Sequence, residues 1–236
     1  MYNFRLYIPF ARNLDLLNKC IESVVPQIHE FSSYVGKKIV VINNSGVHID
    51  AEKELKYPND VDVWELPFEL THAQEANWMI KDTATQGLDF CATTHTDSEL
   101  LPGAMETLIK GYDGVKGTKW YAMGIGSPIF VAFNHRFFIE ENVWFDPFLL
   151  PFYYMDNHMG RIARLRGWSD TLVEGPPTTP LLKHVSSHVL KEDAVFRSKN
   201  NVAFPAHGQI YKAIWGGMPG QEIINDPYAN GTLPRK

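Results

Sequence analysis

Apolar and polar positions alternate along the first half of the chain in a pattern that predicts strands and helices in turn. Short apolar runs at residues 3–10, 37–43, 61–66 and 88–94 are typical of buried strands. Residues 13–25 and 72–87 repeat their apolar positions every three or four residues, which predicts amphipathic helices. We expect Asn13 to cap the first helix, Pro26 to end it, and Gly87 to end the second. A further helix is expected to have Pro102 at its first position. This alternation predicts an α/β fold with a largely parallel sheet.

From about residue 118 the pattern becomes less regular. Residues 119–138 predict short β stretches around a Gly-Ser-Pro turn, and residues 151–167 predict a helix that Gly167 ends. Residues 170–175 and 181–189 are typical of short strands or loops. Beyond residue 190 the chain is polar and rich in Pro, Gly and Asn, so we expect an irregular arm lying over the surface.

Composition is that of an ordinary globular protein. The 236 residues are 44% hydrophobic and 21% charged, and the net charge of −5 at pH 7 argues against a general basic surface for nucleic acid. Cys20 and Cys91 fall in apolar contexts, so we expect two reduced core thiols. The sequence shows no signal-peptide pattern and no apolar run of about 20 residues. We therefore expect a soluble, cytoplasmic protein with no integral membrane segment.

Polar residues follow three of the expected strands where each strand ends. They are Pro9 to Arg12 after the first strand, Asn43 to Ser45 after the second, and Thr94 to Asp97 after the fourth. Ligands of open α/β sheets bind outside the carboxyl ends of the strands, where these segments converge. The sequence therefore predicts one binding site at this edge of the sheet.

Asp97 is the first candidate within that site. A carboxylate beside a strand end suits a hard divalent cation, which prefers oxygen ligands. The alternative is a turn or a helix-capping aspartate, but Pro102 puts the expected cap near Leu101 and leaves Asp97 upstream of it. His95, two residues earlier, could be a nitrogen ligand, a hydrogen-bond partner of a ribose, or a solvent-facing residue.

Two candidates lie later in the chain. Asp156 is expected in the first turn of its helix, where it either complements the helix dipole or acts as a general base on an acceptor hydroxyl. His184 and His188 are four residues apart, but their segment is too rich in serine and β-branched residues for a helix, and no HExxH is present. A single histidine from this late segment could complete a metal shell with Asp97.

The order of several motifs resembles the inverting glycosyltransferase family 2. "IPFARNLDLLNKCIESVVPQ", "IVVINNSG", "HAQEANWMI" and "DFCATTHTDSELLPGAMETLI" are similar to the family's P-x-Y-N, V-V-D-N-S, A-x-N-x-G and D-x-D segments, the last followed by L-L-P-G-A-L. "VAFNHRFFIEENVWFDPFLLPFYYMDNHMGRIARLRGW" is similar to the acceptor-side segment, and "HVSSHV" to a late histidine loop. The resemblance covers most of the chain and implies the glycosyltransferase-A fold, with a Rossmann-like central sheet flanked by helices and a small mixed β half on the acceptor side.

The resemblance also implies domains and roles. Residues 1–190 would form the catalytic domain, with a nucleotide-binding half to about 117 and an acceptor half after it, and residues 191–236 would be an arm packed on it. Asp97 would touch the metal, with His184 as a possible second ligand, and Asp156 would be the base. The residues implied for the nucleotide are Pro9, Ala11, Arg12, Asn43, Asn77, Thr94, His95 and Thr96.

Three departures from the family pattern are visible. His95 replaces the first aspartate of D-x-D, Met155 replaces the glutamate before the base, and Asn43 replaces the aspartate that contacts the nucleobase. An asparagine can still pair with a base edge, but it could favour a different base. The lost carboxylate weakens metal binding unless a residue such as His184 compensates.

The resemblance implies transfer of a sugar, expected from a UDP-linked donor, with Mn²⁺ or Mg²⁺ as cofactor. The acceptor hydroxyl could belong to a glycan, a lipid-linked sugar, a protein or a modified nucleic-acid base. One alternative is a weakened or inactive relative that binds a nucleotide or glycan. A nucleotidyltransferase would need a Gly-rich, Lys/Arg-bearing loop after the first strand, and the sequence has none there. A zinc hydrolase would need histidines at a zinc-ligand spacing, and the sequence does not show that spacing. P-loop, dinucleotide-binding and GxSxG motifs are absent too.

Overall fold

A twisted seven-stranded sheet forms the centre of the protein in the computed structural model, which describes residues 1–125, 129–173, 180–185 and 193–229. The strand order is β3-β2-β1-β4-β7-β6-β8. The pairs β1/β2, β2/β3, β1/β4 and β6/β8 are parallel, whereas β7 runs antiparallel to β4 and β6. The strands are β1 (Leu6–Phe10), β2 (Ile39–Asn43), β3 (Val61–Glu65), β4 (Cys91–Thr94), β6 (Trp120–Ile125), β7 (Phe130–Phe133) and β8 (Ser169–Val173). The predicted α/β fold with a mostly parallel sheet is confirmed.

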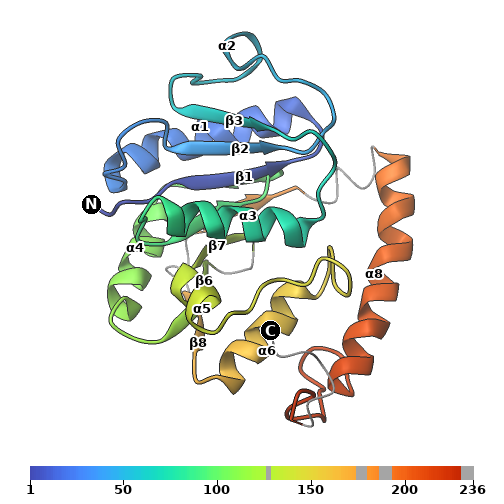
Figure 1. Ribbon diagram of the computed structural model, residues 1–236. Helices are drawn as coiled ribbons and strands as arrows, with labels where there is room; N and C mark the ends of the chain where they lie inside the picture. Colours follow the sequence, from blue (N-terminus) through green and yellow to red (C-terminus); the bar gives the residue numbers. More distant parts are fainter. Residues whose placement is uncertain (126–128, 174–179, 186–192, 230–236) are drawn as a thin grey trace.

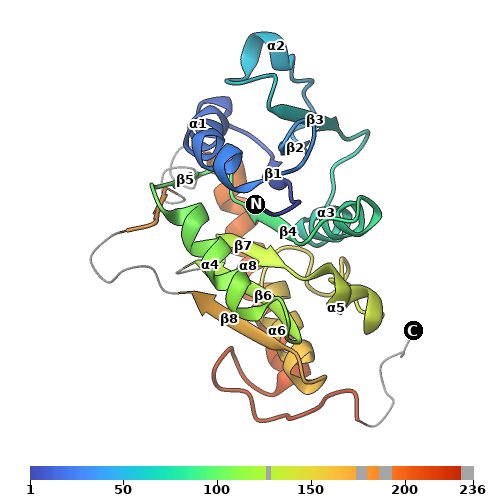
Figure 2. The same cartoon turned by 90° about the vertical axis from the view of Figure 1, so that its left-hand side faces the viewer.

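Helices cover both faces of this sheet. α1 and α4 lie on one side of the strands, and α3 and α5 lie on the other (Figure 2). α8 stands at the side of the molecule toward which β1 runs (Figure 1). The helices are α1 (Leu14–Phe31), α2 (Ala51–Glu54), α3 (His72–Thr85), α4 (Ala104–Val115), α5 (His135–Glu140), α6 (Met155–Leu165) and α8 (Ala194–Trp215).

The side-chain alternation of the central strands divides the core into two parts. Leu6 and Ile8 of β1 pack with α1 and α4, whereas Tyr7 between them packs with α3 and with the aromatic residues of the second half. Every residue of β2 is buried, as expected for a parallel strand covered on both faces. Burying both faces of the sheet makes the hydrophobic effect its main stabilising force.

Helix α1 differs from the sequence-based prediction at its carboxyl end. Asn13 caps it as predicted, accepting a hydrogen bond from the Leu16 amide at 3.1 Å, but Pro26 lies inside the helix, which continues to Phe31. The prediction that Pro26 ends this helix was wrong. The proline is exposed, so water can solvate the backbone carbonyl that loses its partner, while the buried Ile28 in the next turn keeps that turn on the core.

Two other helices, α4 and α5, differ from the sequence-based prediction. α4 begins at Ala104 with Gly103 as its N-cap, so Pro102 precedes the helix instead of opening it. Residues 135–140 form α5, not a strand, because Asn134 ends β7 and caps the helix through the Arg136 amide at 3.1 Å. The predicted Gly-Ser-Pro turn at 126–128 lies outside the described residues.

The C-terminal segment is more ordered than its composition predicted. Residues 194–215 form the 22-residue helix α8, with Pro205 inside it. Tyr211 and Trp215 from this helix are fully buried in the second core cluster, so they anchor it to the rest of the protein. No helix among the described residues is long and apolar enough to cross a membrane.

Candidate functional site

The corner between β4 and the short strand β5 (Ser98–Leu100) is fixed by its own polar groups. The Ser98 amide donates to the His95 carbonyl at 3.2 Å, which closes a turn over residues 95–98. The Ser98 hydroxyl lies 2.6 Å from the same carbonyl and 2.8 Å from the Thr94 hydroxyl. The Thr96 hydroxyl donates to the Pro9 carbonyl, which joins the corner to the end of β1. These bonds hold the backbone that carries His95 and Asp97.

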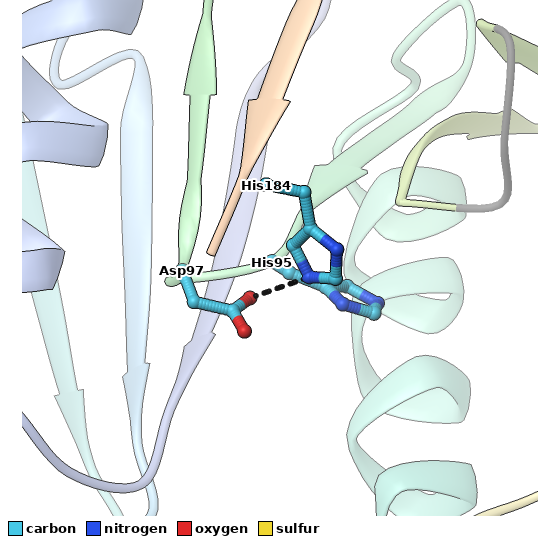
Figure 3. Close-up of side chains that lie close together, drawn as sticks. All are labelled: His95, Asp97 and His184. Atoms are coloured by element: carbon cyan, nitrogen blue, oxygen red, sulfur yellow. Dashed lines mark hydrogen bonds and ion pairs between the residues drawn. The ribbon is translucent and has the colours of Figure 1, made fainter. Parts of the chain in front are cut away.

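His184 reaches this corner through a strand pairing. β9 (Leu182–His184) pairs antiparallel with β5, and the register sets Ser98 opposite His184. The Val185 amide also donates to the Asp97 carbonyl at 3.0 Å. As a result, the His184 Nε2 lies 3.1 Å from the Asp97 Oδ1 (Figure 3). Residues 182–184 are a strand and not a helix, as predicted, and His188 lies outside the described residues.

His95, Asp97 and His184 form one cluster, here called the His-Asp-His cluster. One potential ligand atom from each lies within 4.8 Å of the others (Figure 3). Burial lowers the pKa of His95 to about 3, with smaller contributions from His72 and His184, so at neutral pH its imidazole is neutral and has a lone pair. Two imidazoles and a carboxylate are a chemically suitable donor set for a divalent cation.

A hydrogen-bonded pair of His72 and Glu75 borders the cluster. The ring of His72, at the start of α3, lies edge-on to that of His95 with centroids 6.0 Å apart. Its Nδ1 lies 3.1 Å from Glu75 Oε2, and Glu75 is 5% exposed. The Thr71–Gln74 capping box fixes this first helical turn. Sequence reasoning missed both residues, although their three-residue spacing at a helix start signals such a pair.

Three other residues predicted to contact a nucleotide, Arg12, Asn43 and Asn77, have protein partners. Arg12 forms an ion pair with Asp193, which ties the end of β1 to the start of α8. Asn43 is 2% exposed, and its amide nitrogen donates to the Val47 carbonyl and to Glu65 Oε2, both at 2.7 Å. The Asn77 amide pairs with the Phe145 backbone through bonds of 2.9 and 3.0 Å. Ala11 is exposed at the same sheet edge. Glu65, at the carboxyl end of β3, was missed although that strand end belongs to the predicted edge.

Among the described residues, Asp156 forms no hydrogen bond with the His-Asp-His cluster. It is half-buried in the first turn of α6, and among the described residues no hydrogen bond joins it to His95, Asp97 or His184. Tyr154, two residues before it, has a φ of 62°, a left-handed conformation that is uncommon for a bulky residue. The negative charge of Asp156 adds to burial in raising the pKa of the Tyr121 hydroxyl. The structure therefore confirms that Asp156 lies in the first turn of a helix, and no ion pair joins it to a cationic side chain among the described residues.

A cavity of about 420 Å³ lies elsewhere, between α1 and α4. Its walls include the carboxylates Glu22, Glu30 and Glu106 but no predicted site residue. The cavity is therefore separate from the predicted site at the strand ends.

Comparisons with known proteins support the fold. No family model matches the sequence, and no curated protein matches it. Among solved structures, the chain is similar to a mannosyltransferase from Pyrobaculum calidifontis, solved with GDP-Man and Mn²⁺, at 13% identity and a TM-score of 0.52 over 92% of this chain and 77% of that one. It is also similar to TarS from S. aureus at 11% identity and a TM-score of 0.57, over 89% of this chain and 42% of TarS.

Identities this low establish a shared fold and nothing further. The seven-stranded, mostly parallel sheet with helices on both faces matches these structures, so the predicted glycosyltransferase-A-like fold is confirmed.

Proposed function

We propose that the protein is an inverting glycosyltransferase that moves a sugar from a nucleoside-diphosphate sugar, with UDP as the expected nucleotide, to a hydroxyl acceptor. The main supporting observation is the position of the His-Asp-His cluster, which follows β4 at the carboxyl edge of the sheet. Ligands of open α/β sheets bind at this edge. The P. calidifontis mannosyltransferase has the same fold, and its complex with GDP-Man and Mn²⁺ gives a precedent for such a donor and cofactor.

His95, Asp97 and His184 would hold the divalent cation, expected to be Mn²⁺ or Mg²⁺. A bound cation would supply positive charge to the diphosphate of the donor, which becomes more negative as the sugar leaves. The turn over residues 95–98 and the β5–β9 pairing keep the three side chains in place before any ligand binds. The nucleotide would lie against the neighbouring strand ends, bordered by Pro9, Ala11, Arg12, Asn43 and Asn77.

Asp156 would act as the general base. Its carboxylate would take the proton of the acceptor hydroxyl while the hydroxyl oxygen attacks the anomeric carbon. The bond from that carbon to the diphosphate oxygen would break, and its electron pair would leave with the nucleotide. A single displacement of this kind inverts the anomeric centre. Asp156 pairs with no cation within the part of the chain that the structure describes, which supports this role, because a carboxylate that is already paired with a cation is a weaker base.

Aromatic side chains next to Asp156 offer a surface for the acceptor. Tyr153 packs edge-on to Phe204 of α8 at 5.2 Å, and Phe152 stacks on His207 at 6.3 Å. Phe148 in the preceding loop is 89% exposed. Aromatic faces bind the apolar surfaces of sugars and lipids, so acceptor choice would depend on this segment and on α8.

Calorimetric titration with UDP, GDP, dTDP and CDP, each with and without Mn²⁺, tests the proposal. We expect one nucleotide to bind tightly only with the metal, and this binding to be lost in Asp97→Ala. Release of free sugar from the matching sugar nucleotide, or its transfer, would then establish turnover. Metal-dependent binding without either reaction would favour the alternative of a nucleotide-binding module, and no binding would contradict both.

A further inference from the structure

We propose that the His-Asp-His cluster selects a transition-metal cation with a high affinity for imidazole, such as Co²⁺ or Zn²⁺, and binds Mg²⁺ poorly. This inference rests on the proposed function because it concerns the same metal site, for which it names the class of cation. It excludes Mg²⁺, one of the two expected cofactors, and extends the choice to other transition-metal cations that accept nitrogen ligands.

The chemistry of the donor atoms supports this selectivity. Of the three ligand atoms that lie within 4.8 Å of one another, two are imidazole nitrogens and one is a carboxylate oxygen. Mg²⁺ takes oxygen ligands in a near-ideal octahedron and gives up its water reluctantly. Imidazole instead suits Zn²⁺, Fe²⁺ and related cations, and affinity rises from Mn²⁺ to Co²⁺. Asp97 is the single protein oxygen in the cluster, so Mg²⁺ would gain little from binding there.

The arrangement of the side chains is fixed before a cation arrives. His184 already contacts Asp97 at 3.1 Å, and its ring lies edge-on to that of His95 at 6.0 Å (Figure 3). The ring of His72 also packs against that of His95, and His72 is itself bonded to the buried Glu75. His95 therefore packs against two other imidazole rings, and each of those two rings contacts a carboxylate. A surface ion pair would need neither this third ring nor the strand pairing that brings His184 to Asp97.

Metal titration of the apo protein, after treatment with a chelator, tests the inference without any measurement of turnover. We expect Co²⁺ and Zn²⁺ to bind one site by calorimetry and Mg²⁺ to bind at least about tenfold more weakly. Bound Co²⁺ should also show ligand-field absorption in the visible range that changes when an imidazole ligand is removed. Equal affinities for Mg²⁺ and Co²⁺ would overturn the inference.

Three variants assign the effect to this cluster. His184→Ala should lower Co²⁺ affinity by about 10- to 100-fold or more and alter the visible spectrum. His95→Asp replaces a nitrogen by an oxygen, so it should reduce the ratio of Co²⁺ affinity to Mg²⁺ affinity. The control is His29→Ala, because His29 lies on α1 and pairs with Asp60 at 2.7 Å. If His29→Ala lowers Co²⁺ affinity as much as His184→Ala does, or if His95→Asp leaves the ratio unchanged, the inference is wrong.

Nucleotide titration separates this inference from the proposed function. Selective Co²⁺ binding that is lost in His184→Ala would support the inference even if no nucleotide bound. Tight UDP binding with Mg²⁺ alone would overturn the inference and leave the glycosyltransferase proposal standing.

Discussion

Asp97 and Asp156, the two carboxylates proposed for the chemistry, are held in very different ways. The Asp97 side chain contacts His184, its backbone carbonyl accepts a hydrogen bond from Val185, and the turn that carries it is closed by Ser98. Asp156 has no hydrogen-bond partner among the described residues and follows Tyr154, whose φ is 62°. One carboxylate is fixed by bonds to neighbouring groups, and the other is fixed only by the helix on which it lies.

The difference matches what each role requires. A metal ligand must hold one position, whereas a general base must keep its oxygen available to a proton. The position of Asp156 depends on how α6 packs, and α6 contacts α8 as well as the strands β6 and β8. The Trp215 indole donates to His158 Nδ1 at 3.0 Å, and the rings of Tyr154 and Tyr211 pack at 5.7 Å. The segment that carries the proposed base therefore depends in part on the C-terminal helix.

The largest effect is expected when the base is removed. Asp156→Asn keeps the shape of the side chain but cannot take a proton, so transfer should slow by about 10²- to 10⁴-fold. Nucleotide affinity should stay within error of the original, since Asp156 is not bonded to the His-Asp-His cluster. Steady-state transfer rates and calorimetry measure the two quantities. Undiminished transfer would remove Asp156 from this role.

Asp97 is expected to affect metal-dependent nucleotide binding and not only the rate of transfer. Asp97→Ala removes the oxygen ligand and should weaken metal-dependent nucleotide binding by more than about 100-fold. Metal-independent nucleotide binding should change little. Calorimetry with and without Mn²⁺ measures both, and Asp113→Ala, an exposed carboxylate that pairs with Lys116, is the control. An equal loss in both variants would show a general effect of charge.

The contact between α6 and α8 is expected to contribute strongly to stability. Trp215 is fully buried, so Trp215→Ala should lower the free energy of unfolding by about 3–5 kcal/mol. Trp215→Phe keeps most of the ring but loses the hydrogen bond to His158, so it should cost less. Urea denaturation followed by circular dichroism measures both. A loss below 1 kcal/mol for Trp215→Ala (the level of an exposed surface site) would mean that α8 is not part of the core.

His158 should make the stability that comes from the contact between α6 and α8 sensitive to pH. Burial lowers its pKa to about 4, its Nδ1 accepts from Trp215, and its Nε2 lies 3.0 Å from the Tyr228 hydroxyl. The unfolded chain binds a proton near pH 6.5 and the folded chain does not, so stability should fall as pH drops from 6.5 to 4, by about 2 to 3 kcal/mol. In His158→Gln, which can keep both hydrogen bonds without titrating, this part of the loss should disappear. Identical pH dependence in the two proteins would contradict the assignment.

The smallest effect should come from the polar groups of the β4–β5 corner. Ser98→Ala removes the hydroxyl that contacts the Thr94 hydroxyl and the His95 carbonyl, and should cost about 1 kcal/mol of unfolding free energy. Because the corner positions His95 and Asp97, metal affinity should also fall, by up to about tenfold. Thr107→Ala is a suitable control, since the Thr107 hydroxyl on α4 donates to the carbonyl of Gly103, the N-cap of that helix. If metal affinity falls equally in both variants, the corner does not position the ligands.

The sheet edge and its candidates were predictable because strand periodicity and turn residues are local signals. The periodicity identified β1, β2, β3 and β4, and the polar residues that follow β1, β2 and β4 predicted the edge. The partners of Arg12, Asn43 and Asn77 could not be predicted, because Asp193, Glu65 and the Phe145 backbone are distant in sequence. The helix α8 was missed because polar residues and Pro205 interrupt its apolar pattern, and the tertiary packing of Tyr211 and Trp215 outweighs this weak local preference.

The β5–β9 pairing has a consequence for how the protein matures in the cell. The hydrogen-bonded residues Asp97 and His184 are separated by 87 positions. At a synthesis rate of about 5–20 residues per second, His184 is made roughly 4 to 17 seconds after Asp97. The strands up to β4 are complete by then, so this part of the sheet can form before Asp97 and His184 meet. The proposed metal site would therefore be completed at a late step of folding.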